Sequence, residues 1–173
     1  MDKNLKGLKP ALVWKHFAEI CNIPHPSHEE DAIRAYIVKW AEELGLEHKV
    51  DEAQNVYVYK PATPGMEDRK GIILQAHTDM VPQKNNDKEF NFSTDPIEAY
   101  IDGEWVTAKG TTLGADNGIG VAAAMAILAD KSVVHPPLEV LVTVDEETGM
   151  YGAFALEGGL LQGKTLLNLD SEA

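Results

Sequence analysis

The chain has 173 residues, of which 44% are hydrophobic and 25% are charged, so it has the composition of one ordinary globular domain with enough length for a core. Its 28 Asp and Glu residues outnumber the 15 Lys and Arg residues. The resulting formal charge of -13 argues against binding to nucleic acid or to anionic membrane surfaces.

The amino-terminal part predicts two helices. Residues 1–4 begin no signal peptide, and no run approaches the roughly 18 apolar residues of a spanning helix, so we expect a cytoplasmic protein. Apolar residues recur at helical spacing from Pro10 to Cys21. Cys21 is the only cysteine, which excludes an internal disulfide and a thiolate metal cluster. Residues 28–44 are expected to form the second helix, because Ser27-His28-Glu29-Glu30 has the form of a capping box.

The next part of the chain predicts strands. Residues 55–60 are β-rich, and the apolar run 71–76 is typical of a central strand, which would end at His77. Residues 97–108 contain two short strand-like runs around the turn dipeptide Asp102-Gly103. We expect this hairpin to leave the main sheet and to make that sheet mixed.

The last part alternates a helix with strands. Residues 118–129 are apolar on most sides and predict a buried helix, while residues 138–144 and 165–169 predict two further central strands. This order of elements indicates an α/β fold, a three-layer sandwich with a mixed, mostly parallel sheet and helices on both faces.

Metal-ligand side chains follow the predicted central strands and precede the buried helix. They supply one imidazole and four carboxylates, from His77, Asp116, Glu146, Glu147 and Asp170. Functional groups in open α/β sheets gather beyond the carboxyl ends of the strands, so we expect these five side chains to converge. Zinc binds imidazole and carboxylate, and one carboxylate can bridge two metals roughly 3.5–4 Å apart. The pattern predicts a two-metal hydrolase.

The order of these residues suggests separate roles. Asp79 follows His77 by two residues and could accept a hydrogen bond from the imidazole nitrogen that does not face metal. Asp116 lies between the other ligands in the chain and is the natural bridge. Glu146 and Glu147 are adjacent and point different ways on an extended backbone, so one would bind metal and the other would transfer protons.

Each position alone has a structural alternative. The His-x-Asp pair could be an ordinary turn, Asp116 could be a capping acid, and residues 146–149 or Asp170 could be solvated turns. Their co-occurrence at four separate element ends favours a site.

Other suggestive features carry less weight. His25, His28 and His135 lie near prolines and are interpreted as surface residues. The glycine-rich segment 114–120 lacks the Lys-Ser/Thr ending of a phosphate loop, so nucleotide binding is not expected.

Four motifs in this order resemble the aminoacyl-histidine dipeptidases of the dinuclear zinc peptidase family. They are AHTDMVP at residues 76–82, GTTLGADNG at 110–118, DEETG at 145–149 and NLDSE at 168–172. The resemblance implies a zinc exopeptidase fold and zinc-dependent hydrolysis of aminoacyl- or β-alanyl-histidine dipeptides, with two Zn²⁺ ions for which Co²⁺ or Mn²⁺ could substitute. An amidohydrolase acting on N-acyl amino acids is the alternative within the family.

The resemblance also assigns roles. His77 and Asp170 would hold one zinc, Glu147 the other, and Asp116 would bridge them. Glu146 would be the general base, and Asp79 would orient His77. A cis peptide bond is implied between Asp116 and Asn117.

The family enzymes are more than twice as long as this chain. The resemblance therefore implies that residues 1–173 are the amino-terminal part of the catalytic domain, without the lid or dimerisation domain, through which a homodimer could form, and without the carboxy-terminal part. The expected partner is a small peptide substrate. This part alone is expected to be inactive, and an inactive metal-binding fragment is the alternative from another functional class.

Overall fold

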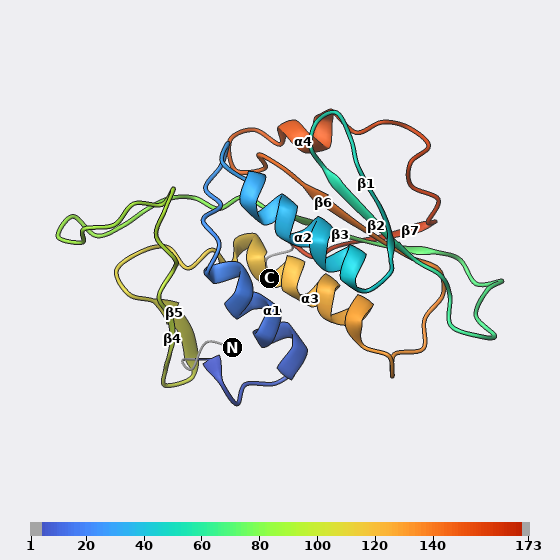
Figure 1. Cartoon of the computed structure of the whole chain (residues 1–173), viewed down its shortest axis with the longest axis horizontal. Helices are drawn as coiled ribbons and strands as arrows, with labels where there is room; N and C mark the ends of the chain where they lie inside the picture. Colours follow the sequence, from blue (N-terminus) through green and yellow to red (C-terminus); the bar gives the residue numbers. More distant parts are fainter. Residues whose placement is uncertain (1–4, 171–173) are drawn as a thin grey trace.

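The computed structural model describes residues 5–170, so residues 1–4 and the last two positions of the 168–172 motif lie outside the described residues. Figure 1 shows a twisted sheet with helices beside it and a separate hairpin. The helices are α1 (Ala11–Cys21), α2 (Asp31–Glu43), α3 (Ala115–Ala129) and the short α4 (Tyr151–Phe154). The strands are β1 (Glu47–Val50), β2 (Val56–Lys60), β3 (Ile72–His77), β4 (Ala99–Asp102), β5 (Trp105–Ala108), β6 (Leu138–Thr143) and β7 (Thr165–Asn168).

The main sheet has five strands in the order β1-β2-β6-β3-β7. Strand β3 pairs in parallel with β6 and β7, whereas β2 is antiparallel to both β1 and β6. The sheet is therefore mixed, as expected, and its antiparallel pairs are β1 with β2 and β2 with β6. The expectation that the hairpin makes it mixed is wrong, because β4 and β5 form a separate two-stranded sheet.

Two helices cover one face of the main sheet, and a third packs against one of them. Helix α1 packs against α3, α3 contacts β3 and β6, and α2 contacts β1 and β2. Alternate residues of the central strands join the core on this side, with Val58, Leu74 and Val140 each less than 5% exposed. The α/β class is confirmed, and residues 5–170 supply one of the two helical layers expected. None of the helices in this described part has the length and apolar character needed to cross a membrane.

The opposite face of the sheet is covered by a loop. Tyr57, Ile73 and Leu141 form a small buried cluster there, and Leu160 and Leu161 pack on it. The buried carboxylate of Glu139 accepts hydrogen bonds from the backbone N–H groups of residues 162 and 163. These bonds satisfy the buried charge and hold the loop before β7 against the sheet.

The predicted elements are present with shifted ends. The first helix and the helix after residue 115 agree with their apolar patterns, but α2 begins at Asp31, three residues later than expected. The capping-box prediction for residues 27–30 is wrong, because no side chain caps α2 and both Ser27 and Glu30 bond elsewhere. The sequence pattern also did not reveal β1.

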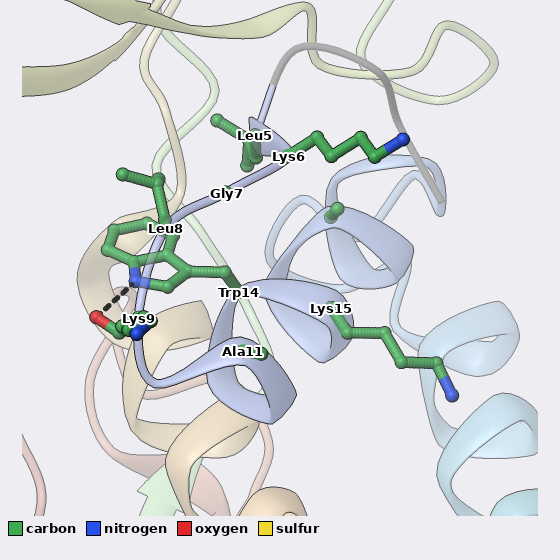
Figure 2. A pocket seen from close by; sticks show the side chains of 9 residues that line it. Leu5, Lys6, Gly7, Leu8, Lys9, Ala11, Trp14 and Lys15 are labelled. Carbon is green, nitrogen blue, oxygen red and sulfur yellow. Dashed lines mark hydrogen bonds between the residues drawn. The ribbon is translucent and has the colours of Figure 1, made fainter.

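The amino-terminal segment adds a pocket beside α1. Figure 2 shows the indole of Trp14 beside Leu8, with its Nε1 donating a hydrogen bond to the Lys9 carbonyl oxygen at 3.1 Å. All the residues that line this pocket lie between Leu5 and Ala18. The pocket therefore includes none of the candidate ligands.

The α1–α3 contact gives a first stability prediction. Phe17 is 1% exposed, and its ring lies against Gly118 at the start of the regular part of α3. We expect Phe17→Ala to lower the free energy of unfolding by about 3–5 kcal/mol, because it leaves a cavity in a packed core. Urea unfolding measures this, with Trp105→Ala as the control: Trp105 is 76% exposed and its loss should cost less than about 0.5 kcal/mol. Equal effects of the two substitutions would contradict the prediction.

Candidate metal centre

The parallel strands bring the candidate ligands to one edge of the sheet. In the register of the sheet, His77 at the end of β3 pairs with Thr143 at the end of β6, and Gln75 pairs with Asn168 at the end of β7. Residues 145–147 and Asp170 follow directly after those strand ends. The carboxyl ends of parallel strands lie at one edge, so convergence here follows from the topology.

His77 lies at the middle of the group. Its Nε2 is 3.1 Å from Asp116 Oδ1, 3.6 Å from Asp170 Oδ2 and 4.0 Å from Glu146 Oε2. The imidazole side chain is 0% exposed, whereas the carboxylate of Asp116 is 58% exposed. Ligand atoms of His77, Asp116 and Asp170 all lie within 4.8 Å of one another. Three residues, at the end of β3, at the start of α3 and after β7, thus present donors to one small volume that is open to solvent on the Asp116 side.

A distortion at the start of α3 places Asp116. Gly114 has a left-handed backbone with φ of 71°, and Asp116 and Asn117 have non-helical angles before the regular helix begins. The peptide bond between Asp116 and Asn117 is cis, as the resemblance implied. The Asn117 side-chain amide donates to Asp170 Oδ1 at 2.9 Å and to the Leu169 carbonyl oxygen at 3.2 Å. The start of α3 is thereby tied to the residues that follow β7.

Asp79 contacts His77 on the other side of the ring. Its Oδ1 is 3.2 Å from His77 Nδ1, and its two oxygens accept the backbone N–H groups of Glu146 and Glu147 and the hydroxyl of Ser27. Although burial raises the pKa of Asp79, the hydrogen bonds from His77, the Glu146 backbone and Ser27 lower this pKa to about 2. Asp79 is thus an ionised acceptor that holds the His77 ring with Nε2 toward the other acids.

Burial and neighbouring charges also shift the pKa values of His77 and Asp170. Burial lowers the pKa of His77, but the hydrogen bond and charge of Asp79 and the charges of Asp170 and Glu146 raise this pKa to about 9. Burial and the neighbouring carboxyl of Asp116 raise the pKa of Asp170 to about 6. The acids are crowded enough to repel one another, and a divalent cation would offset that repulsion.

The two adjacent glutamates have different surroundings. Neither glutamate belongs to the group of His77, Asp116 and Asp170, but Glu146 has a carboxylate oxygen 4.0 Å from His77 Nε2. Glu147 instead lines a cavity of about 270 Å³ with Asp116, Val81 and the segment 112–115. Burial and the charge of Asp116 raise the pKa of Glu147. The cavity leaves room for a small ligand beside two of the expected metal ligands.

The donor set suits a divalent metal. Imidazole nitrogen and carboxylate oxygen are both zinc ligands, and the second nitrogen of His77 bonds a carboxylate, an arrangement common in zinc sites. The side chains present are therefore compatible with a metal held by His77, Asp116 and Asp170.

Two expectations about the remaining residues need correction. His25 and His135 were expected at the surface but are 3% and 4% exposed, whereas His28 is exposed. The sequence interpretation also missed Asn117 and Glu30 as residues that hold the group together. The available signal for Glu30 was the Ser-x-x-Glu pattern, which was assigned to a helix cap.

The chain is similar in sequence and in fold to known peptidases. Residues 73–170, which contain all the candidate ligands, match peptidase family M20/M25/M40. The chain is 59% identical over 168 residues to the cytosol non-specific dipeptidase of Escherichia coli, covering 97% of this chain and 35% of that protein. The crystal structure of an aminoacylhistidine dipeptidase from Vibrio alginolyticus superposes with a TM-score of 0.95 at 60% identity, over 97% of this chain and 34% of that one.

A solved structure with lower sequence identity has the same fold. A tripeptidase from Staphylococcus aureus superposes with a TM-score of 0.79 at 23% identity, over 94% of this chain and 43% of that one. The chain spans about a third of the length of the E. coli and Vibrio proteins. The family match covers more than half of the chain, and the chain belongs to peptidase family M20/M25/M40.

Proposed function

We propose that this chain carries the metal-binding part of a dipeptidase that uses two zinc ions. The observation that supports this most directly is the position of His77 Nε2, 3.1 Å from Asp116 Oδ1 and 3.6 Å from Asp170 Oδ2 at the carboxyl edge of the sheet. Dipeptidase names for the two relatives near 60% identity support the reaction class. Cobalt or manganese could replace zinc in the same donor set.

Each proposed ligand has a position consistent with its role. His77 and Asp170 would hold one zinc, Glu147 would hold the other, and Asp116, between His77 and the cavity that Glu147 lines, would bridge them. When bound, two such ions polarise the peptide carbonyl group and lower the pKa of the attacking water.

Glu146 is the proposed general base. Its carboxylate lies near His77 at the metal group, and its backbone N–H is fixed by Asp79 at 2.9 Å. We propose that it takes the proton from the attacking water and passes that proton to the departing amine, because one carboxylate can serve both steps. Asp79 would keep His77 in the tautomer that offers Nε2 to the metal.

The substrate class proposed is a short peptide, with aminoacyl- or β-alanyl-histidine as the first choice. The cavity beside Asp116 and Glu147 is about 270 Å³, which suits a small molecule. We propose a cytoplasmic location, in agreement with the name of the E. coli relative. Since the chain spans about a third of that relative, we also propose that it is part of a catalytic domain and inactive alone.

Two experiments test this proposal. In the first, this chain replaces the matching segment of the E. coli dipeptidase, and the purified chimera is assayed on β-alanyl-histidine and on N-acetyl-histidine. We expect zinc-dependent hydrolysis of the dipeptide. A preference for the N-acetyl compound would favour the amidohydrolase instead.

The second experiment uses the isolated chain. Its zinc content after dialysis should be above zero but below the two ions of a dinuclear site, and its dipeptide turnover should not exceed that of buffer. Robust turnover by the isolated chain would contradict its proposed dependence on the rest of a longer protein.

A further inference from the structure

The segment from residue 27 to residue 30 contacts two strand ends that carry the candidate centre. It precedes α2 and lies beside the residues that follow β3, because the preceding Pro26 forms a β-bridge with Met80 and the Met80 N–H donates to the His25 carbonyl oxygen. Its side chains then bond to residues after β3 and after β6. We call residues 27–30 the clamp segment.

Ser27 bonds the residue that orients the imidazole. Its hydroxyl donates to Asp79 Oδ2 at 2.8 Å, while Asp79 Oδ1 lies 3.2 Å from His77 Nδ1. Asp79 is fully buried, so each of its hydrogen bonds limits how its carboxylate can rotate. Removal of the Ser27 hydroxyl would leave one buried carboxylate oxygen with a single donor, the Glu147 N–H.

Glu30 bonds the turn that carries the two adjacent glutamates. Its buried carboxylate accepts the Asp145 backbone N–H at 2.9 Å, and Asp145 Oδ1 in return accepts the His28 backbone N–H at 2.8 Å. Asp145 has a left-handed backbone with φ of 50°, a conformation that costs free energy in a residue other than glycine. The paired hydrogen bonds with the clamp segment stabilise this turn.

The same bonds explain why three acids lie close together here. Carboxylate oxygens of Glu30, Asp79 and Asp145 lie within 4.8 Å of one another. Each of these carboxylates accepts at least one backbone N–H, and these dipoles offset the mutual repulsion. The cluster is thus held by donors from both the clamp segment and the turn at residues 145–147.

We propose that Ser27 and Glu30 are positioning residues, which fix Asp79 and the 145–147 turn so that His77, Glu146 and Glu147 are presented in the geometry that the metal centre needs. The expected effect of Ser27 and Glu30 on metal binding rests on the proposed function. Their expected effect on the 145–147 turn does not, because it depends only on hydrogen bonds within the chain.

The test compares substitutions that keep or remove each bond in the full 173-residue chain. Glu30→Met removes the acceptor at nearly constant size, whereas Glu30→Gln keeps an amide oxygen that can accept the Asp145 N–H. Ser27→Ala and Ser27→Thr form the equivalent pair for the hydroxyl donor. The matched controls are Glu29→Met and Ser93→Ala, which break an exposed hydrogen bond of 3.1 Å that the Ser93 hydroxyl donates to Glu29 within the clamp segment and that does not reach the candidate centre.

Two measurements distinguish an effect on the 145–147 turn from an effect on metal binding. Hydrogen exchange of the amides of residues 145–147, measured without metal, reports on the turn. The visible spectrum and the binding curve of added Co²⁺ report on the coordination geometry. We expect Glu30→Met to speed exchange at Asp145, to change the Co²⁺ spectrum and to weaken Co²⁺ binding by roughly 10–100-fold, with Glu30→Gln and both controls close to wild type.

The outcomes distinguish the two proposals. A wild-type chain that shows no Co²⁺ spectrum would overturn the proposed function, while the exchange data would still decide whether the clamp segment holds the turn. Wild-type Co²⁺ binding that is unchanged in Glu30→Met and Ser27→Ala would overturn the positioning role alone. If Glu30→Met does not fold, the smaller substitution Ser27→Ala tests the positioning role instead. The role is supported if the Co²⁺ spectrum of Ser27→Ala differs from that of Ser27→Thr, and it is overturned if the two spectra are the same.

Discussion

Replacement of Asp116 by alanine is expected to deplete both metal ions from the chimera that restores the rest of the enzyme. Asp116 Oδ1 is 3.1 Å from His77 Nε2, and the same carboxylate lines the cavity that Glu147 shares. A bridging carboxylate contributes one oxygen to each metal, so its loss leaves both ions short of a ligand. The metal-to-protein ratio, measured by mass spectrometry after dialysis, should fall from about two to near zero.

The control for this substitution is Asp68→Ala. Asp68 is exposed on the loop before β3, whereas His77 ends that strand, so its loss removes one negative charge at the opposite end of β3 from the centre. Its metal content should equal that of wild type. Asp116→Ala protein that retains one full equivalent of zinc would show that Asp116 serves a single ion, and retention of both would remove it from the ligand set.

The second large effect is expected for Glu146→Ala, which should keep its zinc and lose most of its rate. General base catalysis typically contributes about 10²–10⁴-fold, so kcat of the chimera on β-alanyl-histidine should fall by that factor. The Glu146 carboxylate lies 4.0 Å from His77 Nε2, close to the group of ligands but farther than the oxygens of Asp116 and Asp170.

Glu147→Ala provides the comparison, because the proposed metal ligand should lose zinc as well as rate. Glu157→Ala, an exposed acid after α4, is the control and should change neither quantity. If Glu146→Ala lost zinc while Glu147→Ala kept it, the roles of the two neighbours would be exchanged. The structure makes this comparison worthwhile, since Glu146 rather than Glu147 has an oxygen within 4.0 Å of His77 Nε2.

Strands β3 and β6 could be predicted from the sequence because their signal is local. Each is a mostly apolar run with one polar residue inside it, Gln75 in β3 and Glu139 in β6, and a central strand buried on both faces favours such a run. Strand β1 could not be predicted in this way, since three of the four residues in Glu47–Val50 are polar. Its strand conformation depends on antiparallel pairing with β2, which only the folded chain provides.

The candidate ligands could be predicted from the sequence, but the residues that position them could not. His77, Asp116 and Asp170 were recognisable because each follows or opens a predicted element. The hydrogen bonds of Ser27 and Glu30 join residues 52 and 115 positions apart, so a local pattern contains no information about them. The capping-box interpretation was wrong because these distant partners compete with the local ones for the same two side chains.

The parallel pairing of β3 with β7 determines which changes in chain length the molecule can tolerate. Asp170 stands two residues beyond Asn168, whose partner in the register is Gln75, two residues before His77. Insertions in the exposed part of the loop between α4 and β7 would leave the register of β7 against β3, and with it the position of Asp170, unchanged. Such surface loops accept extra residues at low energetic cost. A single residue gained or lost within Thr165–Asn168 would instead turn the carboxylate of Asp170 to the opposite face of the sheet, so natural length variation should accumulate in the loop and be excluded from the strand.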